Sequence, residues 1–144
     1  MNIDGAAGTA VYRFAGDLNE VDFLRYDVTN LAYAIPGLQT GAVIGVGGGR
    51  DLLSARLFGL SDLVGVEINP IFIELLTRTL SSYTALSRLP GVTFQIDEAR
   101  SWFARADRSF DIIQMSLIDT WAATGAGAFT LSENGLYTVE AWRI

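Results

Sequence analysis

The sequence predicts an α/β domain in which helices cover both faces of a mostly parallel β-sheet. Short apolar runs alternate with segments of helical periodicity, which is the pattern of parallel strands joined by helical crossovers. Half of the 144 residues are hydrophobic, which is ample material for a core. No apolar run reaches the roughly 18 residues that span a bilayer, and the first residues do not resemble a signal peptide. We therefore expect a single cytoplasmic domain, or part of one.

In the amino-terminal half, the expected elements are a short strand over 8–14, a helix over 20–35, a buried strand over 42–46 and a helix over 50–58. The apolar face expected for the first helix consists of Val21, Leu24, Val28, Leu31 and Ala32, which recur at helical spacing. Pro36 and Gly37 end that helix, and Gly59 ends the second one.

In the carboxyl-terminal half, the expected strands are 63–67, 92–96 and 110–115. The expected helices begin near residues 70, 100 and 134, and a Gly/Ala loop over 122–128 precedes the last of them. Asn69 and Pro70 form a helix start, with an N-cap followed by proline at the first helical position. The apolar face of the helix that follows is Ile71, Phe72, Leu75, Leu76, Thr79 and Leu80. In open sheets of this kind, ligands bind beyond the carboxyl ends of the strands.

Residues 42–51, AVIGVGGGRD, place a glycine-rich turn at such a strand end. Glycines cost backbone entropy, so they are kept where the chain bends sharply or approaches a ligand closely. The phosphate loop of NTPases needs Lys and Ser/Thr after the last glycine, which this turn lacks. A dinucleotide G-x-G-x-x-G pattern would put Arg50 at its third glycine. G-x-G-x-G fits Gly45, Gly47 and Gly49 and is typical of proteins that bind S-adenosylmethionine or close analogues; a plain tight turn is the alternative.

An acidic residue, Glu67, ends the next predicted strand, 18 residues after Gly49. A carboxylate there can accept hydrogen bonds from both ribose hydroxyls of a nucleoside. The alternative is that Glu67 helps to cap the helix that starts at Pro70. The spacing and the strand end favour ribose binding.

The third strand end carries Asp97 and Glu98. Either carboxylate, Asp97 in particular, can accept a hydrogen bond from the adenine amino group; capping of the helix that begins near Ala99 is the alternative. The combined pattern, with glycines at one strand end and an acid at each of the next two, is a more specific signal of a nucleoside site than any one of these features. The candidate nucleoside-binding residues are Gly45, Gly47, Gly49, Asp51, Glu67, Ile68, Asp97 and Glu98.

The composition excludes several kinds of chemistry. The sequence has no cysteine and no histidine, so thiolate nucleophiles, Ser-His-Asp triads and zinc sites built on these residues are excluded. We expect no metal. A net charge of −6 disfavours nucleic acid as a partner and is compatible with a cationic substrate.

Four segments carry a resemblance to a known family: VIGVGGGRDLLSARLFG, VGVEINP, DEARSWF and FDIIQMSLIDTWAATGAGAFTLSENGLYTVEAW. From about Tyr26 to its end, the chain resembles spermidine synthase-like proteins of the class I S-adenosylmethionine-dependent methyltransferase superfamily. The resemblance implies a Rossmann-like sheet, a nucleoside pocket at Gly45–Gly49, Glu67 and Asp97, and a transfer site after the fourth strand. It is closest to a branch often found as a soluble domain of larger, sometimes membrane-attached, proteins.

The chain departs from the family pattern at two acids. Aminopropyltransferases carry an acidic pair D-x-x-D after the fourth strand, and the aligned residues here are Ser116 and Asp119. They also carry an Asp in the glycine loop, which holds the amine of the aminopropyl group, and its aligned position here is Gly48. Asp51 lies nearby in sequence and is a candidate substitute.

Asp119 is the candidate catalytic base, with capping of local amides as its alternative role. Trp121 and Tyr137 are candidates for an apolar wall around a sulfonium, or for core residues. A full sheet of this type has seven strands, whereas four follow the first helix here. We therefore expect residues 1–144 to form one partial domain, truncated after the fourth core strand, with an exposed sheet edge.

The favoured function is transfer of an aminopropyl group from decarboxylated S-adenosylmethionine to a small-molecule amine. The alternatives are methyl transfer from S-adenosylmethionine to a small molecule, a non-catalytic nucleoside-binding domain and, more remotely, an NAD-dependent oxidoreductase. The other expected partner is a larger parent chain or a second copy.

Overall fold

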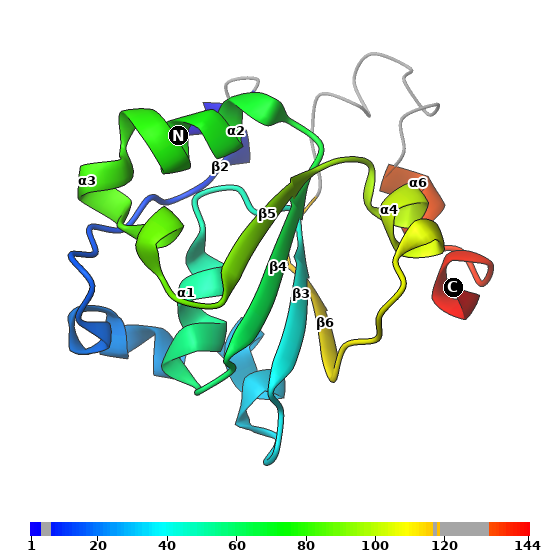
Figure 1. Ribbon diagram of the computed structural model, residues 1–144, viewed down its shortest axis with the longest axis horizontal. Helices are drawn as coiled ribbons and strands as arrows, with labels where there is room; N and C mark the ends of the chain where they lie inside the picture. Colours follow the sequence, from blue (N-terminus) through cyan, green and yellow to red (C-terminus); the bar gives the residue numbers. More distant parts are fainter. Residues whose placement is uncertain (4–6, 117, 119–132) are drawn as a thin grey trace.

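The computed structural model describes residues 1–3, 7–116, 118 and 133–144. Its central feature is a sheet of four parallel strands: β3 (Thr40–Ile44), β4 (Asp62–Glu67), β5 (Val92–Ile96) and β6 (Ile112–Met115) (Figure 1). Their order across the sheet is β5-β4-β3-β6. The order reverses between β3 and β6, which is where ligands bind in sheets of this kind. The expected α/β, Rossmann-like fold is confirmed.

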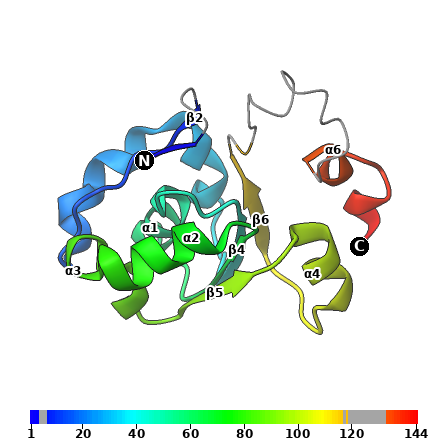
Figure 2. The same cartoon turned by 90° about the horizontal axis from the view of Figure 1, so that it is seen from above.

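Helices cover both faces of the sheet (Figure 2). On one face lie the α-helices α1 (Arg50–Leu57), α2 (Pro70–Glu74) and α3 (Ser81–Thr84), the π-helix η3 (Leu75–Thr79), and the 3-10 helices η1 (Leu18–Tyr26), η2 (Val28–Ala34) and η4 (Leu86–Arg88). On the other lie α4 (Ala99–Arg105), α6 (Glu133–Leu136) and the 3-10 helix η5 (Ala141–Arg143).

Two hydrophobic clusters correspond to these two layers. Leu63 joins the larger cluster with α1 and η1, whereas Val64 and Val66 join a smaller one that includes the aromatic side chains of α4. This division follows from the alternation of side chains along β4. The apolar run of β4 is therefore explained by burial on both faces.

The expected helix over 20–35 is wrong as a single α-helix. The chain forms two 3-10 helices, η1 and η2, separated at Asp27, whose backbone is extended (φ −80°, ψ 125°). The Asp27 carboxylate accepts the Thr29 N–H at 3.0 Å and so starts η2 afresh. The new start rotates the buried face, so Val28 and Leu31 are exposed, and the side chains that η2 buries are Asn30 and Tyr33.

The expected strand over 8–14 is also mostly wrong. A two-residue strand, β2 (Ala7–Gly8), pairs antiparallel with β1 (Asn2–Ile3), and the chain then leaves the ladder. Phe14 is fully buried, and its N–H donates to the Tyr83 carbonyl at 2.8 Å. Its burial comes from packing on helices and not from a strand.

The other elements lie close to their expected positions. Asn69 caps α2 and Pro70 begins it, as expected, but the helix changes to π-helical turns in η3. In this segment Phe72, Ile73 and Leu76 are buried, whereas Ile71, expected on the inner face, is exposed. The helical segment expected from residue 134 consists of two short pieces, α6 and η5.

Among the described residues, the longest apolar helix falls short of what a membrane crossing requires.

Candidate nucleoside site

The glycine loop between β3 and α1 needs its glycines for backbone geometry. Gly45, Gly47 and Gly49 have φ of 75°, 50° and 84°, in the left-handed region that side chains disfavour. The Gly45 N–H donates to the Val66 carbonyl at 2.9 Å, which ties the loop to β4. A Cβ on Gly49 would lie 2.2 Å from a methyl of Leu86. The sharp bend expected at this strand end is therefore present.

Glu67, at the end of β4, is 6% exposed and faces this loop. Its Oε2 accepts the Gly47 N–H at 3.1 Å, and its Oε1 accepts the Asn69 N–H at 2.9 Å. Both hydrogen bonds fix the carboxylate between the glycine loop and the start of α2. Glu67 therefore contacts the start of α2, which is the alternative role that the sequence suggested for it. Each oxygen keeps acceptor capacity, so ribose binding stays a prediction.

Asp97 and Glu98, after β5, have different roles. Glu98 caps α4, because its two oxygens accept the N–H groups of Arg100 at 2.9 Å and Ser101 at 2.8 Å. Burial alone would raise the pKa of Glu98, but the hydrogen bonds from Ser101 and Arg100 outweigh it and lower the pKa. Asp97 accepts the Glu98 N–H at 2.9 Å and pairs with Arg105.

Exposed isoleucines lie next to these acids. Ile68 follows Glu67 and is 60% exposed, and Ile96 precedes Asp97 and is also exposed. Glu67 and Ile96 are paired in register on adjacent strands, so the two isoleucines and the two acids share one corner of the sheet. A flat aromatic base fits such a surface, because its faces are apolar and its edge is polar.

The amino-terminal segment lies over the glycine loop. The Gly48 N–H donates to Thr9 Oγ1 at 2.9 Å, and a Cβ placed on Gly48 would lie 1.8 Å from the Ala10 carbonyl oxygen. A side chain at position 48 is therefore incompatible with this path of the chain. This contact gives a physical reason for glycine at the position where the resemblance implies an aspartate.

A cluster of polar side chains lies where the strand order reverses; we call Asp27, Arg50, Asp51 and Ser116 the switch-point cluster. Arg50 Nε lies 3.0 Å from Asp51 Oδ1, and its Nη1 lies 3.3 Å from Asp27 Oδ2. Its Nη2 donates to Ser116 Oγ at 3.1 Å, and the Ser116 hydroxyl donates to Asp51 Oδ2. Asp51 is only 6% exposed. The structure thus brings Asp51 next to Ser116, the residue aligned with the missing acid.

Sequence reasoning did not predict that Asp27 and Arg50 meet in this cluster. Arg50 was considered only as an obstacle to a dinucleotide motif, and Asp27 was placed inside a helix. The signal that was available is the spacing of Asp27 and Thr29, which is typical of an N-cap and therefore indicates a helix start after Asp27.

Asp119 and Trp121 lie outside the described residues. Tyr137 follows α6 and is half exposed, and a role in lining the site stays a prediction. Within the described ranges, no three acidic side chains are grouped in a way that would hold a metal ion.

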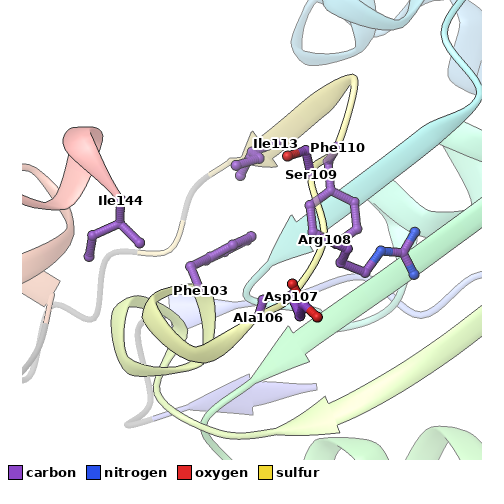
Figure 3. Close-up of a pocket in the computed structure, with 8 residues that line it drawn as sticks. All are labelled: Phe103, Ala106, Asp107, Arg108, Ser109, Phe110, Ile113 and Ile144. Atoms are coloured by element: carbon purple, nitrogen blue, oxygen red, sulfur yellow. The ribbon is translucent and has the colours of Figure 1, made fainter.

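A pocket of about 490 Å³ lies away from the glycine loop, between α4, the loop that follows it and β6 (Figure 3). It is lined by Phe103, Ala106, Asp107, Arg108, Ser109, Phe110, Ile113 and Ile144. Arg108 pairs with Asp62 at the first residue of β4, which places this pocket toward the amino ends of the strands. Ligands of parallel sheets bind at the opposite end, so we do not assign the nucleoside to it.

Comparison with solved structures identifies the architecture. A spermidine synthase solved in complex with the transition state analogue AdoDATO matches 65% of this chain and 34% of its own, with a TM-score of 0.52 and 16% identity. The fold is spermidine synthase-like. Spermidine synthase from Thermotoga maritima matches with a TM-score of 0.49 and 16% identity, over 65% of this chain and 33% of its own.

The chain spans about a third of the length of the spermidine synthases it matches. No family model matches the sequence, and no curated protein matches it.

Proposed function

We propose that this chain is the nucleoside-binding part of a spermidine synthase-like transferase, which moves an aminopropyl group from decarboxylated S-adenosylmethionine to an amine. The observation that carries the proposal is the buried Glu67 carboxylate, held by backbone N–H groups beside the glycine loop in a spermidine synthase-like fold. The likeness to a spermidine synthase that binds AdoDATO supports it.

In this proposal Glu67 accepts hydrogen bonds from the two ribose hydroxyls of the nucleoside. The base lies against Ile68 and Ile96, and Asp97 accepts a hydrogen bond from its amino group. Asp97 already pairs with Arg105, so this bond uses the remaining acceptor capacity of its carboxylate. Glu98 caps α4 with both of its oxygens, and the proposal assigns it no contact with the base.

The reaction is a displacement at the carbon next to a sulfonium. The nitrogen of the acceptor amine attacks that carbon, a C–N bond forms and the C–S bond breaks. The sulfur keeps the electron pair and leaves as the neutral thioether 5′-methylthioadenosine, and the nitrogen releases its proton to a base. The protein supplies mainly alignment, which is worth several kcal/mol. Asp119 stays the proposed base.

Methyl transfer from S-adenosylmethionine is the second candidate. It is favoured by the absence of an acid at Gly48 and at Ser116, the two positions where the resemblance implies groups for amine chemistry. It uses the same nucleoside site, with attack at the methyl carbon and S-adenosylhomocysteine as the leaving group. The donor is a substrate in both reactions, and neither proposal includes a metal.

Isothermal titration with four compounds tests the proposal: 5′-methylthioadenosine, decarboxylated S-adenosylmethionine, S-adenosylmethionine and NAD. We expect the first two to bind, and an amine panel with the decarboxylated donor to release 5′-methylthioadenosine. Preference for S-adenosylmethionine would favour methyl transfer, and binding without turnover would favour a non-catalytic domain. Binding of NAD in the absence of binding by the adenosyl compounds would contradict the nucleoside site itself.

A further inference from the structure

We propose that the amino-terminal hairpin is a flap over the glycine loop, latched by the Thr9 hydroxyl, and that it opens before a nucleoside can bind. The hairpin consists of β1, β2 and the two residues that follow them, Thr9 and Ala10. It lies near the carboxyl ends of the parallel strands (Figure 1). The inference rests on the proposed function, since it concerns access to the proposed nucleoside site.

The glycines of the loop have no free N–H group to offer a ligand. Each of Gly45, Gly47, Gly48 and Gly49 donates its N–H to an acceptor within the protein. In chain order, the acceptors are the Val66 carbonyl at 2.9 Å, the Glu67 carboxylate at 3.1 Å, the Thr9 hydroxyl at 2.9 Å and the Val46 carbonyl at 2.8 Å. Of these four, the acceptor of Gly48 is the one that belongs to the hairpin. Movement of the hairpin therefore frees this N–H and leaves the loop intact.

The hairpin also touches the loop over two successive residues. A Cβ placed on Gly48 would lie 1.8 Å from the Ala10 carbonyl oxygen, and one placed on Gly47 would lie 3.0 Å from Thr9 Oγ1. The Ala10 oxygen is thus in contact with the Gly48 backbone, and no ligand atom fits between them. The tip of the loop is closed in this structure.

The closed tip adjoins the proposed position of the ribose. The Glu67 carboxylate, which binds the ribose in the proposed function, accepts the Gly47 N–H at 3.1 Å. A nucleoside held by Glu67 needs room beside Gly47, and the Thr9 side chain occupies space next to that residue. The hairpin and the nucleoside therefore compete for the same part of the loop.

The hairpin can open while the chain that follows it stays in place. β1 and β2 have two residues each and pair with each other and with no other described strand, and an isolated hairpin of this kind is marginally stable. Beyond Ala10 the chain is anchored, because Val11 and Tyr12 pack against the larger hydrophobic cluster and Phe14 is fully buried. The hinge therefore lies between Ala10 and Val11. The latch is a neutral hydrogen bond, which contributes little net stability.

A flap and a wall of the site predict opposite effects when the latch is removed. A closed flap lowers the apparent affinity by the fraction of molecules that are open. Removing the Thr9 hydroxyl raises this fraction, so it should strengthen binding although the folded protein loses a hydrogen bond. A Thr9 side chain that instead contacts the ligand would weaken binding when it is changed.

The test uses 5′-methylthioadenosine as the ligand and three variants. Thr9→Val removes the hydroxyl at nearly constant size, and Thr9→Ser keeps it. Thr93→Val is the matched control, since its hydroxyl donates to the Leu63 carbonyl near the start of β4. Isothermal titration measures the affinity, and amide hydrogen exchange followed by NMR measures opening at Gly48 and Gly45 without ligand. Circular dichroism melting checks the fold of each variant.

We expect Thr9→Val to bind 5′-methylthioadenosine several-fold more tightly than the unaltered protein. Thr9→Ser and Thr93→Val should bind it as the unaltered protein does. In the absence of ligand, the Gly48 N–H should exchange faster than the Gly45 N–H, whose acceptor lies in β4, and Thr9→Val should increase the ratio of the two rates.

Binding that Thr9→Val weakens or leaves unchanged would overturn the flap, and so would exchange at Gly48 as slow as at Gly45. If Thr9→Val does not fold, the exchange rates of the unaltered protein decide. If no variant binds 5′-methylthioadenosine, the proposed function fails, and the exchange rates still show whether the hairpin opens.

Discussion

At the scale of single residues, Glu67 connects the fold to the proposed ligand. It accepts backbone N–H groups from the glycine loop and from the start of α2, so its position is set before any ligand arrives. Such preorganisation lowers the entropy cost of binding. The same two bonds mean that Glu67 also stabilises the fold.

Replacing Glu67 by alanine should therefore have two effects. Nucleoside affinity should fall about tenfold or more, because two charge-assisted hydrogen bonds to the ribose are lost. The free energy of unfolding should fall by about 1–3 kcal/mol, because two backbone N–H groups lose their acceptor. Titration with 5′-methylthioadenosine measures the affinity, and urea unfolding measures the free energy of unfolding. Glu74→Ala, on the exposed face of α2, is the matched control, and an unchanged affinity in Glu67→Ala would remove this residue from the site.

Gly48 gives a second prediction at this scale. Gly48→Ala should lower the free energy of unfolding by about 1–3 kcal/mol, because its Cβ overlaps the Ala10 carbonyl oxygen. Deleting residues 1–10 should abolish most of that penalty, so the two changes should be strongly non-additive in urea unfolding. Gly135→Ala is the control, since a Cβ there meets an Arg100 nitrogen at 3.9 Å. Additive effects would show that the amino-terminal segment does not lie over the loop.

At the scale of secondary-structure elements, Asp111 joins the starts of two strands. Its Oδ2 accepts three hydrogen bonds: from the Gln39 N–H at 2.9 Å, from the Thr40 N–H at 2.8 Å and from the Thr40 hydroxyl at 3.0 Å. These hydrogen bonds, that from Gln39 first, lower the pKa of Asp111. The residue therefore links β3 to β6, the two strands between which the strand order reverses.

This link makes stability depend on pH. The folded state holds the Asp111 proton less tightly than the unfolded chain, so the stabilisation is present above the ordinary aspartate pKa of about 4 and is lost as the pH falls through the lowered folded value. Asp111→Asn should be less stable than the unaltered protein at pH 7, and the difference should shrink toward pH 2. Urea unfolding from pH 7 to pH 2 measures this, with exposed Asp107→Asn as the control. A difference that is constant across this range would contradict the ionic role of Asp111.

The sequence predicts the elements whose signals are local. The apolar run of β4 followed by Asn69 and Pro70 identifies a strand, a turn and a helix start, and all three are present. The helix over 20–35 could not be predicted in this way, because Asp27 caps a new helix where the apolar spacing continues. The strand over 8–14 failed for a similar reason, since Phe14 is buried by packing and not by strand pairing.

The site was predictable only where each residue stands at a strand end. The glycine loop, Glu67 and Asp97 meet this condition and lie at the carboxyl edge as expected. The switch-point cluster as a whole does not: Ser116 directly follows a strand, but Asp27, Arg50 and Ser116 come from three distant segments and meet only after folding. Local spacing carries no information about such contacts. Asp119 lies outside the described residues, and its role stays a prediction.

At the scale of the whole molecule, the proposed ligand position joins three elements at one edge of the sheet: the glycine loop, the end of β4 and the end of β5 (Figure 1). A ligand bound there should stabilise the folded state by mass action. At about 100 times its dissociation constant, 5′-methylthioadenosine should add about 2.7 kcal/mol to the free energy of unfolding. NAD at the same concentration should not. Thermal unfolding with each compound measures this, and equal stabilisation by the two would contradict a site selective for the adenosyl thioether.

A crystal structure of the protein with 5′-methylthioadenosine tests the nucleoside site most directly. We predict the ribose hydroxyls within hydrogen-bond distance of the Glu67 carboxylate and the base against Ile68 and Ile96. A nucleoside bound instead in the pocket between Phe103 and Ile113 (Figure 3), with Glu67 still held only by Gly47 and Asn69, would contradict it.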